Sequence, residues 1–480
     1  MTSLASRLEE HLHPERMRVL RVCAGVAERR DIDLYLVGGA VRDTMLAPAT
    51  PTTPTTPSSD TGTGTGIGDT GTPDLDIAGP SIDRGFASEV AEALGGRFVA
   101  SSAFGTYKLI VPNAATPETA ESKVDPASGA DIEIDLVTSR SETYAEPGAL
   151  PDVSPGSVAD DLARRDFSVG AMCMVLAPPT GSDMTWGDLI DPFDGEGDIE
   201  RKLIRVLHPE SFIDDPTRIF RAVRYGARLG FGLETGTGKL LRSALGYIQR
   251  LSGDRVRHEL ERIFDEAQPG EILAWAQEMG VLKAVFEEMG ADADVLVTAK
   301  FPAGEDGRDA WAGLLAYPVP PQRSQALSKR LNLGSRTGRV VRDVAGICFG
   351  FHGLRSGLAR KSEIYSFLSY RTEAAIRACA AATEDETLRV ALNIYLDELI
   401  DVEPSLTGHD IQEMGVPQGP VVGQLLRQLL YARLDGEVTT PEQERAFVQS
   451  RLGLISEPQA SEPHSAGPHP ETGPAPGPEL

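Results

Sequence analysis

The sequence predicts an α+β protein with a mixed α/β head followed by an all-helical body. Two observations support this prediction. Short apolar or alternating runs, bounded by glycine and proline and typical of strands, occur in roughly the first 200 residues. From about residue 208 to about 450, apolar residues recur instead with the spacing of amphipathic helices.

The head is expected to contain helices and strands in alternation. Residues 1–30 predict an amphipathic helix that leads into a strand at 34–37. Residues 48–73 form a low-complexity insert of proline, threonine and glycine, which has too few apolar residues to fold and is expected to be a disordered loop. The elements expected after it are a strand at 74–78, a helix at 84–95, two strands within 97–111, a polar loop at 112–130 and a strand at 131–138.

The remainder is expected to be an extended link, a set of helices and a tail. Pro147, Pro151 and Pro155 indicate an extended link, and helical periodicity then predicts helices at 215–229, 237–250, 254–266 and 270–279, with more up to about 450. The last 25 residues contain seven prolines and no apolar periodicity, so we expect a disordered tail.

Composition restricts the class of protein. Hydrophobic residues make up 41% of the chain and charged residues 24%, as in soluble globular proteins. No apolar run approaches the ~20 residues needed to cross a bilayer, and no signal-peptide core is present. The four cysteines are scattered, so we expect free thiols in a reducing cytoplasm rather than disulfides or a zinc site. A net charge of −25 argues against indiscriminate nucleic-acid binding.

A glycine turn is the first candidate binding element. Gly38 and Gly39 follow the apolar run 34–37, and glycines let backbone N–H groups approach an anion such as a triphosphate closely. Arg42 could donate to phosphate oxygens, although a structural pair with Asp43 is the alternative.

Acidic residues downstream of this turn are candidate metal ligands. Asp74 and Asp76 stand at i and i+2, so a strand would place both carboxylates on one face, as Mg²⁺ requires. Asp135, from the alternating segment 131–136, would add a third carboxylate, with Glu133 as the alternative. Such a site suits in-line attack of a 3′-hydroxyl on an α-phosphate. Alternatively, Asp74 and Asp76 merely begin a strand.

Two arginine-containing clusters could complete a nucleotide site. In residues 161–167, Arg165 could reach a ribose or phosphate while its neighbours pair with acids, although a surface ion-pair cluster would look the same. In residues 214–224, Asp215 precedes a proline, which also suits a plain helix cap.

The second cluster also suits base recognition. Asp215, Arg218 and Arg221 recur at helical spacing and share one ridge. A carboxylate that accepts from an exocyclic amino group, beside a guanidinium that donates to a ring nitrogen, matches the Watson–Crick edges of cytosine and adenine. Guanine and uracil present the reversed pattern, so the pair could select C and A without a nucleic-acid template.

Taken together, these motifs resemble the tRNA nucleotidyltransferase/poly(A) polymerase family in its bacterial class II form. The resemblance covers roughly residues 20–270. It rests on the motifs at 36–43 (Leu-Val-Gly-Gly-Ala-Val-Arg-Asp), 74–76 (Asp-Leu-Asp), 161–168 (Asp-Leu-Ala-Arg-Arg-Asp-Phe-Ser), 188–193 (Asp-Leu-Ile-Asp-Pro-Phe) and 214–224 (Asp-Asp-Pro-Thr-Arg, running into two further arginines).

The resemblance implies a nucleotidyltransferase head of the DNA polymerase β-like type, followed by an all-α neck, body and tail. We therefore expect a catalytic head at 1–207, a base-reading neck at 208–270, a tRNA-binding body and tail at 271–455 and a disordered end at 456–480. It also implies roles for individual residues: Mg²⁺ on Asp74 and Asp76, and nucleotide contacts from Gly38, Gly39, Arg42, Arg165, Asp215, Arg218, Arg221 and Arg224.

The implied activity is the addition of C and/or A to the 3′ end of tRNA from CTP and ATP, in the cytoplasm. Addition of all of CCA, of CC only or of A only, and poly(A) polymerase activity, are alternatives within the family. A catalytically silent RNA-binding protein is the alternative outside it. A basic stripe at 321–342 then becomes a candidate phosphate-contact surface, the alternative being a solvated helical face.

The sequence departs from the family pattern in four ways, one of which is that no HD-type phosphohydrolase domain is recognised in the C-terminal half. The connection between the glycine turn and the aspartates is the long 48–73 insert, where the family usually has a short loop. Asp214 stands where the family commonly has Glu. Gly170 replaces a usual Asn and so lacks its amide group, which puts the local architecture there in question.

Overall fold

A computed structural model describes residues 4–47, 75–101, 105–112, 131–351 and 360–456. These residues belong to two compact units, one made of residues 1–350 and 371–384 and the other of residues 351–370 and 385–480. The insert at 48–73 and nearly all of the tail predicted at 456–480 lie outside the described residues, so these two predictions stay predictions.

A seven-stranded mixed sheet lies at the centre of the first unit. Its strands are β1 (Leu34–Val37), β2 (Leu75–Gly79), β3 (Arg97–Ser101), β4 (Thr106–Val111), β5 (Ile132–Thr138), β8 (Cys173–Ala177) and β9 (Leu189–Ile190). They are ordered β3-β4-β5-β2-β1-β8-β9, with β2 and β5 parallel and the other neighbours antiparallel. The predicted head with a mixed sheet is confirmed.

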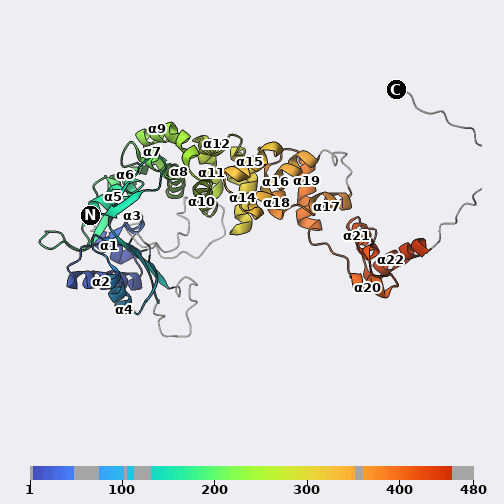
Figure 1. The fold of residues 1–480 in the computed structure, drawn as a ribbon, viewed down its shortest axis with the longest axis horizontal. Coiled ribbons are helices and arrows are strands. Elements are labelled where there is room, and N and C mark those ends of the chain that lie inside the picture. The colour runs from blue at the N-terminus through green and yellow to red at the C-terminus, as the bar shows by residue number, and fades with distance from the viewer. Residues whose placement is uncertain (1–3, 48–74, 102–104, 113–130, 352–359, 457–480) are drawn as a thin grey trace, which may run out of the picture. The chain divides into compact units, whose positions relative to one another are not determined.

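Two helices, α2 (Pro14–Arg29) and α4 (Arg84–Leu94), pack against each other and against strands of the sheet (Figure 1). Alternate strand residues such as Leu36, Ile77 and Ile134 join them in one buried cluster. The single helix predicted at 1–30 is wrong, because α1 (Leu4–His11) ends before Pro14 begins α2. Proline lacks the N–H that an uninterrupted helix would need at that point, and it is favoured at a first helical position.

The opposite face of the sheet bears the candidate carboxylates. Asp76 lies between the core residues Leu75 and Ile77, and Asp135 between Ile134 and Leu136. Since successive side chains on a strand point to opposite faces, both carboxylates lie on the face away from α2 and α4. A short helix, α5 (Val158–Ala163), packs on that same face with residues of β1 and β8.

A hairpin replaces part of the extended link predicted from the prolines around residue 150. Strands β6 (Arg140–Thr143) and β7 (Asp152–Pro155) form a separate two-stranded antiparallel sheet. Both strands are short and largely polar, so they lack the apolar alternation by which strands are recognised in a sequence.

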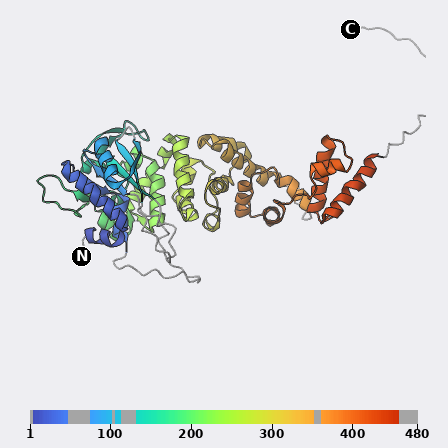
Figure 2. The same cartoon turned by 90° about the horizontal axis from the view of Figure 1, so that it is seen from below.

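Helices make up the rest of the first unit. The predicted helices correspond to α8 (Thr217–Leu229), to α9 (Thr235–Ala244) with the 3₁₀ segment η3 (Leu245–Arg250), to α10 (Gly253–Phe264) and to α11 (Pro269–Glu278). Helices α8, α10 and α11 pack against one another and lie side by side in Figure 1; Figure 2 shows the green helices of this stretch from below. The others are α3 (Gly39–Leu46), α6 (Gly195–Arg201), α7 (Ser211–Asp214), α12 (Val281–Val285), α13 (Ala293–Thr298), α14 (Glu305–Ala316), α15 (Pro321–Arg330), α16 (Ser335–Gly350) and α18 (Glu373–Ala382), with the 3₁₀ turn η2 (Ser168–Gly170) and the two-residue strands β10 (Leu203–Ile204) and β11 (Gly232–Leu233).

The second unit is helical in its described part. It contains α17 (Lys361–Leu368), α19 (Glu386–Ile394), the π-helical turn η5 (Tyr395–Leu399), α20 (Gly408–Glu413), α21 (Pro420–Leu434) and α22 (Pro441–Ser456). Residues such as Ile411, Leu429 and Val448 form a small buried core there. Throughout the described part of both units, no helix combines the length and apolar character of a membrane span.

Candidate active site

One cavity of about 540 Å³ in the first unit brings most of the predicted site residues together. This volume falls within the range of roughly 300–1,000 Å³ typical of small-molecule sites. The predicted residues that line it are Gly38, Gly39, Arg42, Asp76, Arg165, Asp215, Arg218 and Arg221. Of the others, Asp74 lies outside the described residues, whereas Asp135 and Arg224 are described but are not part of this lining.

The turn at Gly38 requires glycine for two reasons. Its φ of +72° disfavours residues with a Cβ, and a Cβ built there would lie 2.5 Å from Nη1 of Arg165. The Gly38 N–H donates to the carbonyl oxygen of Met172, 3.1 Å away, directly before β8. The turn therefore places the first residues of α3 directly under the Arg165 guanidinium.

Arg42 lies on α3 and lines the cavity while paired with its neighbour. Its Nη2 is 2.7 Å from Oδ1 of Asp43, and its side chain is 11% exposed. The structural pair considered in the sequence analysis is therefore present. The pair does not remove Arg42 from the cavity, where the guanidinium remains part of the lining.

Asp76 and Asp135 are neighbours across the sheet. They are register partners in the parallel pair of β2 and β5, and adjacent strands lie about 4.8 Å apart. Glu133, the alternative third carboxylate, is half-exposed, and its Oε2 lies 2.6 Å from Nζ of Lys108 on β4. The position of Asp135 beside Asp76 therefore makes it the better candidate of the two.

The pair of aspartates fits a Mg²⁺ site in part. The described residues contain no cluster of three or more His, Cys, Asp or Glu side chains that could hold a metal. Mg²⁺ in enzymes commonly uses only one or two protein carboxylates and takes its other ligands from water and substrate phosphates. Two adjacent carboxylates on one sheet face meet that need, and Asp74 precedes them just beyond the described part.

A buried carboxylate organises the arginines at 164 and 165. Asp161 is 1% exposed and accepts from Nη2 of Arg164 at 2.6 Å and from Nη2 of Arg165 at 3.1 Å. The cluster is thus not an ion pair on the surface, as the alternative interpretation would require. Arg165 Nη1 also donates to the carbonyl oxygen of Gly170 at 3.4 Å, so its guanidinium is held over the glycine turn.

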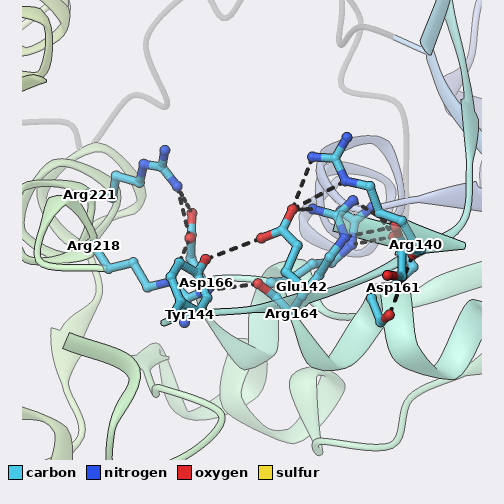
Figure 3. A network of polar contacts seen from close by, with 11 residues as sticks. Arg140, Glu142, Tyr144, Asp161, Arg164, Asp166, Arg218 and Arg221 are labelled. Carbon is cyan, nitrogen blue, oxygen red and sulfur yellow. Dashed lines mark hydrogen bonds and ion pairs between the residues drawn. The ribbon is translucent and has the colours of Figure 1, made fainter. Parts of the chain in front are cut away.

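The β6 strand supplies site residues that the sequence analysis missed. Glu142 accepts from Arg140 at 3.0 Å and Arg164 at 3.1 Å through Oε1, and from the Tyr144 hydroxyl at 3.2 Å through Oε2 (Figure 3). Burial, with the charges of Glu142 and Asp215, raises the pKa of Tyr144 to about 12, so its hydroxyl remains a donor at neutral pH. Residues 140 and 142 stand at i and i+2 on β6, a spacing that places both side chains on one face, and Tyr144 follows just after the strand.

Asp166 connects the two arginines of α8. Arg221 Nη1 is 2.9 Å from both carboxylate oxygens of Asp166, and Arg218 Nε is 3.3 Å from Oδ1 (Figure 3). Burial opposes the charge of Arg221, but Asp166 and Glu259 outweigh it and raise the pKa of its guanidinium.

Arg218 has a buried N–H group that donates to no described residue. It is 2% exposed, and its Nη2 donates to the carbonyl oxygen of Arg164 at 2.8 Å. Its Nη1 is buried and has no hydrogen-bond partner among the described residues. Since a buried donor without a partner is costly, this nitrogen is suited to a ligand acceptor in the cavity that Arg218 lines.

Asp215 is held through one of its carboxylate oxygens. Oδ1 accepts from the Thr217 backbone N–H at 3.1 Å, from the Thr217 hydroxyl at 2.7 Å and from Nη2 of Arg255 at 2.7 Å. The contact with Thr217 is the helix-capping contact that the sequence analysis gave as the alternative role of Asp215. The sequence analysis did not identify Arg255, which lies 40 residues further along the chain and has no local signal.

Arg224 contacts a different set of residues. Its Nη1 donates to Oε1 of Glu266 at 3.1 Å, and its guanidinium lies 4.7 Å from the ring centroid of Tyr225. Tyr225 and Arg228, rather than Arg224, belong to the described lining of the cavity. A nucleotide contact from Arg224 stays a prediction.

The cavity is more basic than the chain. Its described lining contains seven arginines and four carboxylates, in a chain whose net charge is −25. Positive charge concentrated in a concave site raises the local concentration of anionic ligands. The cavity therefore suits a polyphosphate.

The predicted basic stripe at 321–342 is largely neutralised within the protein. Arg336 pairs with Glu305, Asp306 and Asp309, and Arg330 donates to backbone carbonyls at residues 248 and 251. Arg323 and Arg339 also pair with acids. Arg336 and Arg339, about half-exposed, fit the alternative of a solvated helical face, whereas Arg330 is used for contacts within the protein.

Comparison with known proteins identifies the class of this fold. Residues 34–205 match the model of the Poly A polymerase head domain, and residues 230–292 match the model described as a probable RNA and SrmB-binding site of polymerase A. The seven-stranded sheet therefore belongs to a nucleotidyltransferase head, and residues 215–228, which follow the matched head, complete the lining of the cavity. The helices within 230–292, which follow this head in the chain, match the second of these models. Over these two stretches the chain matches the poly(A) polymerase family models, and the relatives reported next are tRNA nucleotidyltransferases.

Relatives and a solved structure match over most of the chain. An A-adding tRNA nucleotidyltransferase of Geobacter sulfurreducens is 27% identical over 91% of this chain, which spans about half (47%) of that relative. An A-adding tRNA nucleotidyltransferase of Halalkalibacterium halodurans is 26% identical and matches over 93% of this chain and 95% of its own length. A CCA-adding enzyme in an apo form has the same fold, with a TM-score of 0.71 and 24% identity over 94% of this chain and 99% of its own.

Proposed function

We propose that this protein adds C and/or A to the 3′ end of tRNA, with CTP and ATP as substrates. The observation that supports this most directly is that one cavity is lined by the glycine turn, by Asp76 and by the Asp215–Arg218 pair. A nucleotidyltransferase must hold a triphosphate, promote attack at its α-phosphate and select a base. The three groups of residues match these three tasks.

The phosphate end of the cavity lies near Gly38 and Gly39. Arg165, held by Asp161, and Arg42, held by Asp43, lie next to this turn. Because their carboxylate partners fix both guanidiniums, phosphate oxygens would meet donors that are already oriented.

Asp74 and Asp76, with Asp135 as the third carboxylate, would hold Mg²⁺ at this end. Bound Mg²⁺ lowers the pKa of an attacking 3′-hydroxyl and stabilises charge on the departing pyrophosphate. The contribution of the chain is to place the carboxylates of Asp76 and Asp135 side by side on one sheet face, next to the turn that holds the phosphates.

The base end of the cavity contains Asp215 and Arg218. Arg218 Nη1 would donate to the ring nitrogen of C or A, and the Asp215 carboxylate would accept from the exocyclic amino group. U and G would set a carbonyl against the carboxylate and an N–H against the guanidinium, which leaves buried groups without partners. Arg221, one turn further along α8, contacts the same Asp166 carboxylate as Arg218. It would thereby help to hold Arg218 in position for the base.

The helices beyond the cavity would bind the tRNA. We assign the head to 1–207, the neck to 208–270 and the tRNA-binding body and tail to 271–455, in keeping with the polymerase A RNA-binding model that matches 230–292. We assign this activity to the cytoplasm.

Addition of A alone is the second candidate. Both relatives reported above, which match over more than 90% of this chain, are named A-adding tRNA nucleotidyltransferases. The acceptor on Asp215 and the donor on Arg218 match C and A equally well. These two residues therefore do not distinguish an enzyme that adds only A from one that adds CCA or CC.

The test is extension of defined tRNA ends. Purified protein and Mg²⁺ are incubated with tRNA that lacks CCA, ends in CC or is complete, with CTP and ATP supplied singly and together. Addition of C and then A to the shortest tRNA indicates a CCA-adding enzyme, and addition of A only to the CC end indicates an A-adding one. Long runs of A on an unrelated RNA would refute the tRNA assignment, and no incorporation on any end would refute the proposed function.

A further inference from the structure

One guanidinium links the base-reading carboxylate to a segment of the head. Arg255 on α10 donates through Nη2 to Oδ1 of Asp215 at 2.7 Å and through Nη1 to the carbonyl oxygen of Gly148, also at 2.7 Å. Its side chain is 25% exposed, so both contacts are shielded from water in large part. The planar fork of a guanidinium fixes the relative positions of two such acceptors, which a lysine ammonium cannot do.

The two carboxylate oxygens of Asp215 are used unequally. Every side-chain hydrogen bond that the described residues make with Asp215 ends on Oδ1, with Thr217 and Arg255 as donors. Three donors on one oxygen fix the plane of the carboxylate. Oδ2 is then the oxygen left to accept from an exocyclic amino group in the cavity that Asp215 lines.

The other acceptor of Arg255 lies in the segment at 144–151. Gly148 also donates its N–H to the carbonyl oxygen of Asp214 at 3.2 Å, directly before the reading residue. A Cβ built on Gly148 would lie 3.5 Å from Cβ of Arg250 and 3.8 Å from Cδ of Pro216, so the segment packs closely on these residues. The ends of the segment, Tyr144 and Pro151, line the cavity.

We infer that Arg255 is a positioning residue for nucleotide selection. It orients Asp215 so that Oδ2 faces the incoming base, and it holds the 144–151 segment beside that base as a wall of the cavity. This inference rests on the proposed function. A merely structural Arg255 would change stability, and would change the use of all four nucleotides by the same factor.

The test compares substitutions on one helix. Arg255→Ala removes both contacts, and Arg255→Lys retains the charge but lacks the planar fork that spans the two acceptors. Arg257→Ala is the matched control, because Arg257 lies on α10, pairs with Asp254 at 2.8 Å and Glu261 at 3.3 Å, and is absent from the described cavity lining. The value of kcat/KM is measured for ATP, CTP, UTP and GTP on the tRNA end that the wild type extends, alongside thermal unfolding.

The expected result is a loss of selectivity. Arg255→Ala should lower the preference for the cognate nucleotide over UTP by at least about tenfold, since the orientation of a charged acceptor is lost. Arg257→Ala should leave this ratio unchanged. Arg255→Lys should retain part of the preference for the cognate nucleotide. If Arg255→Ala does not fold, the selectivity of Arg255→Lys tests the inference instead.

The contradicting results are distinct from one another. Unchanged selectivity, or an equal loss for all four nucleotides, in an active Arg255 variant refutes the positioning role alone. A wild-type protein that extends no tRNA end refutes the proposed function and the inference together.

Discussion

Replacement of Gly38 by alanine tests the glycine turn. The φ of Gly38 is +72°, and backbone strain of this kind costs about 1–3 kcal/mol for a residue with a Cβ. The new Cβ would also lie 2.5 Å from Nη1 of Arg165, against 3.4–4 Å for an ordinary contact, so the guanidinium must move by about 1 Å. A misplacement of about 1 Å in a substrate-positioning group can reduce the rate about 100-fold.

A control variant separates the effect of backbone strain on stability from the effect of the displaced Arg165 on catalysis. Gly95→Ala is the matched control, since Gly95 has a φ of +65° at the end of α4 and a Cβ there would meet nothing within 4 Å. We expect both variants to lose stability in urea unfolding, Gly95→Ala by about 1–2 kcal/mol. Only Gly38→Ala should lose about 100-fold in kcat/KM for nucleotide incorporation. If Gly38→Ala retained both wild-type stability and wild-type kcat/KM, the role given to the turn would be refuted.

Two further predictions concern Arg218 and His208. Arg218→Ala removes the buried Nη1 donor and should abolish the preference for C and A over U and G, measured as ratios of kcat/KM; discrimination equal to the wild type would defeat the protein-template mechanism. Burial and the nearby Arg218 charge lower the pKa of His208 from its usual 6.5, although Asp214 partly opposes the shift. The unfolded chain therefore binds this proton at a higher pH than the folded one, and stability falls as the pH drops below about 6.5. His208→Gln should flatten the urea-measured loss of stability between about pH 7 and pH 5, and an unaltered slope would contradict the assignment.

Local sequence signals predicted much of the fold because the elements concerned carry their own boundaries. The strand at 34–37 is a continuous apolar run that ends at the glycine turn, and it is found at Leu34–Val37. The helix at 84–95 ends at Gly95, whose left-handed conformation closes α4. Elements without such signals were misjudged: the β6–β7 hairpin has no apolar alternation, and the break at Pro14 was read as part of one helix.

The candidate site was predicted where motifs are local and missed where contacts are distant. Alternation in 131–136 placed Asp135 and Glu133 on one face, but only the register of β2 with β5 brings Asp135 rather than Glu133 next to Asp76. The contact between Arg255 and Asp215 spans 40 residues and depends on the packing of α8 against α10. Glu142 was missed for the same reason, since its partner Arg164 comes from a different element.

Nucleotide incorporation by Asp76→Asn and Asp135→Asn, measured beside tRNA affinity, is the most direct test of the catalytic account. Each substitution preserves the shape of the side chain and removes one negative charge from the pair on β2 and β5. We predict a fall in incorporation of at least about 1,000-fold for each variant, with the Kd for tRNA changed by no more than about twofold. Wild-type incorporation by either variant would show that its carboxylate does not serve the reaction, and would contradict the account.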